Sequence, residues 1–157
     1  MRIAVPVTNK DEIEYLALAG ADEMQFSCFL QSQGVGLYTS KTSGHFIRGF
    51  GSCAELDEGV GAARRNGCSS SLLLDFKDVT DGDLPGVLAT VDSFLDMGGD
   101  AVIARGLGLV GDLLELIPRA QILVCALPEC SFASTIWFCR HIGVSRLILP
   151  VVVTVAD

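Results

Sequence analysis

The sequence predicts an α/β protein, a partial TIM-type (β/α)8 barrel with about six parallel strands and alternating helices. Short apolar runs of strand length alternate with stretches of helical period along all 157 residues. Most of these apolar runs are continuous, which is typical of strands buried on both faces of a parallel sheet. No composition shift or low-complexity segment divides the chain, so we expect a single domain over residues 1–157.

Six segments have the length and the apolar content of buried strands. They are Ile3–Val7, Glu23–Cys28, Ser70–Phe76, Ala101–Ala104, Gln121–Leu127 and Arg146–Val152. Between them lie segments of helical period, which are Asp11–Ala19, Ala54–Arg65, Leu84–Met97, Leu109–Leu116 and Phe132–His141. Together they predict successive β-α units.

Capping residues support the ends of these helices. Asn9 is a plausible N-cap for the first helix, and Ser52 with Glu55 forms a capping-box pattern before the second. Glycine tolerates the left-handed conformation that closes a helix. Four glycines stand a few residues before a predicted strand: Gly20, Gly67, Gly98 and Gly143. We therefore expect each of them to end a helix.

The segment between Cys28 and Ser52 interrupts this rhythm. It is rich in glycine and serine and is too long for an ordinary connection between a strand and a helix. It leaves the carboxyl end of the second strand, which is the face where barrel enzymes place their active sites. We interpret it as a lid or a binding loop.

Composition and charge exclude several classes of protein. Hydrophobic residues make up 50% of the chain and charged residues 19%, which is the reverse of a disordered chain. No window holds the roughly 18 apolar residues that a membrane helix needs, and we expect a cytoplasmic protein. The formal charge of −8 makes nucleic acid an unfavourable partner, because an acidic surface repels phosphates.

The cysteines do not predict a metal site. No two of them form a C-x-x-C pair, so the zinc-ribbon and thioredoxin signatures are absent from the sequence. A cluster on Cys28, Cys125, Cys130 and Cys139 is an alternative, but these four fall on a helix, strands and a loop, so their convergence is geometrically awkward. We expect buried or incidental cysteines.

Residues at the predicted strand ends are the candidates for chemistry. An acid, a base and a thiolate that converge there would resemble a hydrolytic site. The catalytic candidates are Cys28, His45, Asp75, Glu129 and Cys130, and the ligand-binding candidates are Asn9, Arg105, Gly106 and Gly108.

The run Gly106-Leu107-Gly108-Leu109-Val110-Gly111 fits the G-x-G-x-x-G pattern of dinucleotide-binding proteins. It follows a predicted strand and opens a predicted helix, and Glu129 comes later at about the expected distance for a ribose contact. The motif belongs to the fourth β-α unit rather than the first. A dinucleotide site is therefore the less favoured alternative to a simple anion site at this helix start, beside Arg105.

The opening Ile3-Ala4-Val5-Pro6-Val7-Thr8-Asn9, followed by Ala19-Gly20-Ala21-Asp22-Glu23-Met24, resembles the start of the collagenase-like peptidases, the U-thirty-two peptidase family. The resemblance continues through Glu55–Arg65, Gly67, Gly99–Ile103, Leu107-Gly108, Leu116–Pro118 and Gly143–Leu149. It therefore covers almost the whole chain as an ordered series of motifs.

The resemblance implies a TIM-type barrel for full-length members, of which this chain is similar to the front part. It implies a hydrolase of the peptidase type, or an enzyme that supports hydroxylation of RNA bases or quinone precursors. The iron–sulfur cluster of such relatives is held by cysteines largely beyond the region seen here, so we expect no cofactor in this chain. The expected ligand is a peptide, a modified nucleoside or another small molecule.

The chain departs from the family at three positions that carry polar residues in relatives. It has Gln25 in place of the usual tyrosine, Val124–Leu127 in the fifth strand and Val151–Val153 after the sixth. These replacements favour, as an alternative function, a non-catalytic binding or assembly module. An arc of six strands also leaves unpaired edges, so we expect a homo-oligomer or a second chain that completes the barrel.

Overall fold

The computed structural model describes residues 2–32, 35–38, 49–76, 79–125 and 133–148. Six parallel strands form one sheet, β1 (Ala4–Val7), β2 (Glu23–Phe26), β5 (Ser69–Leu74), β6 (Ala101–Ala104), β7 (Gln121–Cys125) and β8 (Arg146–Ile148). The helical elements are η1 (Lys10–Glu12), α1 (Ile13–Leu18), α2 (Cys53–Arg65), α3 (Leu84–Asp96), α4 (Leu107–Leu116) and α5 (Ala133–His141).

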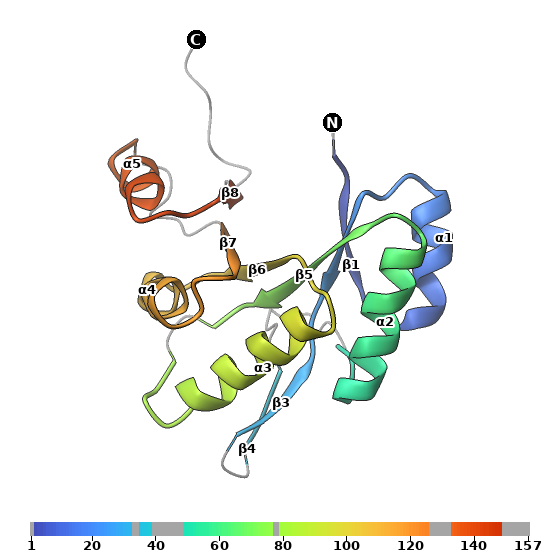
Figure 1. The fold of residues 1–157 in the computed structure, drawn as a ribbon, viewed down its shortest axis with the longest axis horizontal. Coiled ribbons are helices and arrows are strands. Elements are labelled where there is room, and N and C mark those ends of the chain that lie inside the picture. The colour runs from blue at the N-terminus through green and yellow to red at the C-terminus, as the bar shows by residue number, and fades with distance from the viewer. Residues whose placement is uncertain (1, 33–34, 39–48, 77–78, 126–132, 149–157) are drawn as a thin grey trace.

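The order of the strands identifies the architecture. The sheet runs β1-β2-β5-β6-β7-β8, so each strand pairs with the next parallel strand along the chain. Helices α1 to α5 follow one another around the outside of the curved sheet (Figure 1). A doubly wound sheet would instead reverse its order partway. The structure is a half-barrel of β-α units, as the sequence predicts.

The predicted element ends agree to within about two residues for most elements. The strand Ala101–Ala104 is confirmed at both ends. Helix α4 begins at Leu107 rather than Leu109, because Gly106 is extended and the helix follows it at once. The second strand ends at Phe26 rather than Cys28, and Cys28 instead forms an isolated bridge with Phe50. The predicted ends at Leu127 and Val152 lie outside the described residues.

Four glycines end helices as predicted, with positive φ at Gly20, Gly67, Gly98 and Gly143. Two of them lead into an aspartate that ties one strand to its neighbour. The Oδ2 atom of Asp22 accepts a hydrogen bond from the Ile3 amide at 2.7 Å, and Oδ2 of Asp100 accepts one from the Ser70 amide at 2.8 Å. This repeated turn sets the register at the amino ends of the strands.

The segment after Cys28 contains an element that the sequence analysis interpreted as loop. Strands β3 (Phe29–Ser32) and β4 (Val35–Tyr38) form an antiparallel hairpin that lies beside α3 (Figure 1). The sequence analysis assigned no strand to these residues, because two four-residue strands are too short to show a pattern in a glycine-rich stretch; the role of a lid or a binding loop stays a prediction. Residues 39–48 of the predicted lid are outside the described residues.

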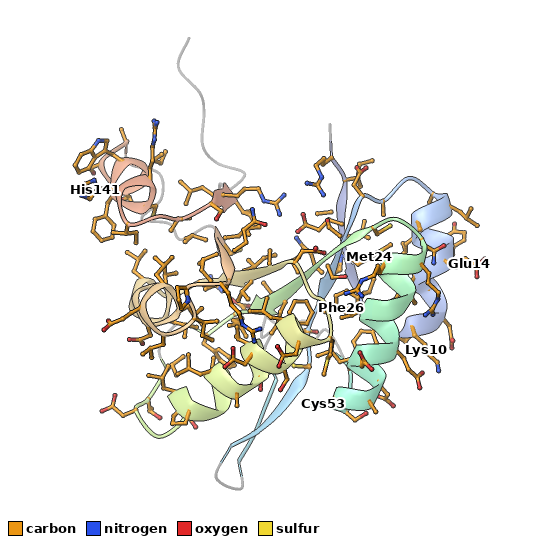
Figure 2. The ribbon with its side chains drawn as sticks, viewed as in Figure 1. Lys10, Glu14, Met24, Phe26, Cys53 and His141 are labelled. Atoms are coloured by element: carbon orange, nitrogen blue, oxygen red, sulfur yellow. The ribbon has the colours of Figure 1, made fainter. Side chains whose placement is uncertain are left out.

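The main core lies between the outer face of the sheet and the helices. Met24 and Phe26 lie between β2 and α2 (Figure 2). The ring of Phe26 packs against Phe50 and Phe94, with centroid distances of 5.4 and 6.3 Å. Burial of such aromatic area supplies a large share of the stability of a fold of this size. This outer core positions the strands, and thereby their carboxyl ends.

The inner face of the half-barrel has a smaller apolar cluster. Ala101, Ile103 and Leu123 are buried there, and Leu73, Cys125 and Ile148 pack against them half-buried. Strand pairing brings these residues together, since Ile103 is the register partner of both Leu73 and Leu123. The inner face thus has apolar side chains that the described residues cover only in part.

Candidate functional site

Asp75 and Arg105 lie side by side at the carboxyl edge of the sheet. Each directly follows a strand, and the last residues of those strands, Leu74 and Ala104, are register partners. Oδ1 of Asp75 lies 2.8 Å from Nη1 of Arg105. The Asp75 side chain is 5% exposed and the Arg105 side chain 40%. The sequence analysis proposed both residues separately, and the structure joins them in one ion pair.

The second oxygen of Asp75 is the unusual feature of this pair. Oδ2 is buried and has no hydrogen-bond partner among the described residues. A buried acceptor without a donor costs about 1–3 kcal/mol, and more when it is charged. Asp75 therefore keeps an unsatisfied acceptor at this edge of the sheet, and Arg105 is the more exposed member of the pair.

Helix α4 starts directly beside this pair. Its N-cap, Gly106, is extended (φ −85°, ψ 129°) and makes no side-chain capping bond. The first amides of a helix have no intrahelical partner, so they present donors and partial positive charge. Gly108 is exposed, and a Cβ there would meet nothing within 4 Å. Gly106 itself is buried, so the open part of this helix start is the side at Gly108.

The dinucleotide alternative loses its structural context. Gly111 would mediate close packing between helix and strand in that motif, yet a Cβ at Gly111 would meet nothing within 4 Å. The strand order is also that of a barrel arc rather than of a dinucleotide-binding sheet. Glu129, the expected ribose contact, is outside the described residues. The glycines here open a helix, and a dinucleotide role has no support from the fold.

Asn9 serves the local backbone. Its Oδ1 atom accepts from the Asp11 amide at 2.9 Å, and Oε1 of Glu12 accepts from the amides of Asn9 and Thr8. This is a complete capping box at the start of η1. Asn9 also lines a cavity of about 250 Å³ between this turn and Phe50. The Asn9 side chain therefore holds the turn, and its ligand-binding role stays a prediction.

Of the two cysteines proposed as catalytic, Cys28 is the one that the structure describes. Cys28 is buried at 5% exposure in the apolar core, in the same cluster as Phe26 and Phe50. Cys139 is fully buried in α5, whereas Cys125 lies on the inner face. Burial raises the pKa of the Cys68 thiol, which disfavours its thiolate. Among the described residues, no three acidic, histidine or cysteine side chains form a metal-binding group.

Three of the proposed catalytic residues fall outside the described residues: His45, Glu129 and Cys130. The structure therefore brings together Asp75, Arg105 and the helix start at Gly106 and Gly108, and it says nothing of a partner from those three.

A second ion pair, missed in the sequence analysis, crosses the inner face. Nη2 of Arg146 on β8 lies 2.6 Å from Oε2 of Glu23 on β2, and the Ser71 hydroxyl donates to Oε1 of Glu23 at 2.8 Å. Glu23 is 4% exposed. The signal was available, because a charged residue opens each of these two apolar strands. Their 123-residue separation hid the pairing.

The fold and this edge define a class of protein, a β-α half-barrel with an ion pair at the carboxyl ends of its strands. A family model described as Peptidase family U32 matches residues 40–157. The match covers more than half of the chain, so the chain belongs to peptidase family U32. This confirms the resemblance found in the sequence.

Solved structures share the fold at low identity. A candidate phosphonomutase from Burkholderia cenocepacia J2315 matches with a TM-score of 0.64 and 18% identity, over 95% of this chain and 64% of that one. A 2,3-dimethylmalate lyase of the PEP mutase/isocitrate lyase superfamily matches with a TM-score of 0.58 and 12% identity, over 95% and 52%. This chain thus spans less than two thirds of either protein.

Two further comparisons limit the conclusions. No curated protein matches the chain. Within the described parts of the structure, every helix is too short or too polar to cross a bilayer.

Proposed function

We propose that this chain is a ligand-binding arc of a family U32 barrel, and that it binds a peptide at the carboxyl ends of β5 and β6. The observation that carries the proposal is the Asp75–Arg105 pair, with Oδ2 of Asp75 buried and unpartnered among the described residues. Barrels place their sites at this edge of the sheet.

A peptide suits the chemistry of the pair. Its backbone supplies N–H donors for the carboxylate of Asp75 and carbonyl or carboxylate acceptors for the guanidinium of Arg105. A nucleic acid would meet a chain with a net charge of −8. Peptide ligands also agree with the peptidase name of the family.

Hydrolysis by the chain alone is expected to be weak or absent. Catalysis needs polar groups where charge develops. Strand β7 ends in Leu123, Val124 and Cys125, where the resemblance implies polar side chains in other family members. We therefore favour binding over turnover for this arc. Robust cleavage of gelatin that is abolished by Cys28→Ala or His45→Ala would contradict this part of the proposal.

Titration calorimetry with a short gelatin-derived peptide tests the site. Asp75→Asn and Arg105→Gln are each expected to weaken binding at least about tenfold, since each removes a charged hydrogen-bonding group. The matched control is Arg119→Gln, which removes an exposed arginine paired with Asp92 and Asp96 on α3. Equal affinity of all four proteins would sink the assignment.

The inner face of the arc supports a further part of the proposal, a partner that covers it. Leu73, Cys125 and Ile148 are half-buried there, and β1 and β8 are the two edge strands of the described sheet. We propose a second copy or a second chain that completes the barrel, in the cytoplasm. Light scattering that shows a stable monomer at all concentrations would contradict association through this face.

A further inference from the structure

We propose that this site recognises the carboxyl terminus of a peptide. The carboxylate would lie between Arg105 and the first amides of α4, and the N–H of the same terminal residue would donate to Oδ2 of Asp75. This inference rests on the proposed function and names the part of the peptide that the site binds.

The start of α4 supplies the first half of the argument. The helix has ten residues, begins after Gly106 and makes no side-chain cap. The amide of Val110 bonds to the Gly106 carbonyl at 3.0 Å, so the amides before it fall in the first turn, where an α-helix leaves them without an intrahelical acceptor. Such helix ends favour carboxylates and phosphates.

Asp75 supplies an independent second half. Its side chain is only 5% exposed, and its unpartnered Oδ2 shares a carboxyl group with the oxygen that binds Arg105. Arg105 and Gly106 are consecutive in the chain. The unsatisfied Oδ2 of Asp75 thus belongs to the residue paired with Arg105, and Arg105 leads directly into the start of α4, whose first amides favour an anion.

Together these two halves select the kind of ligand. A bare phosphate would bring a larger negative charge than a carboxylate near Asp75 and has no N–H to donate to its Oδ2. A peptide terminus has both groups, because its last N–H and its carboxylate belong to one residue. The nitrogen and the carboxylate carbon lie about 2.5 Å apart by standard backbone geometry. One terminal residue can thus satisfy Asp75 and face the helix start.

The chain offers a clean way to remove one helix amide. Helix α3 begins Leu84-Pro85, and α4 begins Leu107-Gly108, so proline occupies in α3 the position that glycine occupies in α4. Proline is tolerated in the first turn and lacks the N–H. Gly108→Pro therefore deletes a donor, while Gly108→Ala adds a methyl group into open space and keeps the donor.

The experiment compares one gelatin-derived peptide as the free acid and as the C-terminal amide, by calorimetry on the full chain. The wild type and Gly108→Ala are expected to prefer the acid by about tenfold or more, as charge-assisted hydrogen bonds would give. Gly108→Pro should lose most of that preference, because it removes an amide that would bind the charged carboxylate. Asp75→Asn should weaken acid and amide alike, because both forms keep the terminal N–H.

The outcomes separate this inference from the proposed function. Equal binding of acid and amide by the wild type, with both weakened by Asp75→Asn, would overturn the carboxylate assignment and keep the peptide site. No binding of either form would overturn the proposed function itself. Inorganic phosphate that competes as well as the free acid would also overturn the inference. Circular dichroism checks whether Gly108→Pro is folded. If that variant unfolds, the ratio of the wild-type affinities for the acid and the amide tests the inference by itself.

Discussion

The two faces of strand β5 differ in how completely the protein covers them. Leu72 and Leu74 point to the outer face and are fully buried against the helices. Leu73, between them, points to the inner face and is only half-buried, in the small cluster with Ile103 and Leu123. Successive residues of a strand face opposite sides, so one short sequence serves two environments.

The difference separates stability from function. The outer face has the aromatic core of Phe26, Phe50 and Phe94, which is closed by the helices. The inner face has the polar residues: Glu23 with Arg146, and at its upper edge Asp75 with Arg105. A fold that is held from outside leaves its inner face available for a ligand or a partner.

Two neighbouring leucines test this separation most strongly. Leu72→Ala is expected to lower the free energy of unfolding by about 2–5 kcal/mol, because it leaves a cavity in a closed core. Leu73→Ala should cost about 1 kcal/mol, since part of that side chain is already in contact with solvent. Urea unfolding of both variants measures the difference. Equal losses would show that the inner face is as tightly packed as the outer face.

The Glu23–Arg146 pair gives the next largest expected effect. Arg146→Gln leaves the buried carboxylate of Glu23 with the Ser71 hydroxyl alone. Breaking a fully buried pair costs about 3–5 kcal/mol, and the 42% exposure of the Arg146 side chain reduces this to about 1–3 kcal/mol. The double variant with Glu23→Gln should recover part of the loss in the same urea experiment. No recovery would mean that Arg146 acts through packing rather than charge.

Thiol labelling compares the two faces by access. Cys125 on the inner face is half-buried, while Cys139 is fully buried and burial raises the pKa of Cys68. Thiolates react and buried thiols do not, so Cys125 should react with a maleimide at least about tenfold faster than either. Mass spectrometry of the digested protein assigns each site. Protection of Cys125 at high protein concentration would support a partner on the inner face, whereas faster labelling of Cys68 would contradict the comparison.

The sequence predicted those features that depend on neighbours along the chain. Ala101–Ala104 is a continuous apolar run, and Gly98 closes a helix by its own backbone freedom, so both were recognisable. The β3–β4 hairpin was missed, because its strands are short and its composition resembles a loop.

The site was predictable only in its parts. Asp75 and Arg105 follow apolar runs, which marks them as residues at strand ends. Their contact depends on the register of β5 against β6, and the Glu23–Arg146 contact depends on the curvature of the whole sheet. Curvature is a tertiary property that leaves no local pattern in the sequence. No spacing of residues therefore predicted the Glu23–Arg146 pair.

The smallest expected effect belongs to an ion pair on the outer surface, away from both faces. Lys10 and Glu58 form an exposed salt bridge, which lowers the pKa of Glu58 and raises that of Lys10. The contribution of Glu58 is present above its ordinary value of 4.5 and is lost as the pH falls through its lowered folded value. The contribution of Lys10 is present below 10.5 and is lost as the pH rises through its raised folded value.

Glu58→Gln should therefore lower the melting temperature slightly at neutral pH and low salt. The loss should vanish in about 1 M salt, where the Debye length falls to about 3 Å, and also in acid, where the wild-type Glu58 is protonated and as uncharged as the glutamine that replaces it. Exposed pairs contribute little because water and ions screen them. Thermal melts at several salt concentrations measure this, with Leu73→Ala as the reference. A loss larger than that of Leu73→Ala would mean that surface charge, rather than the closed outer core, distinguishes the two sides of the sheet.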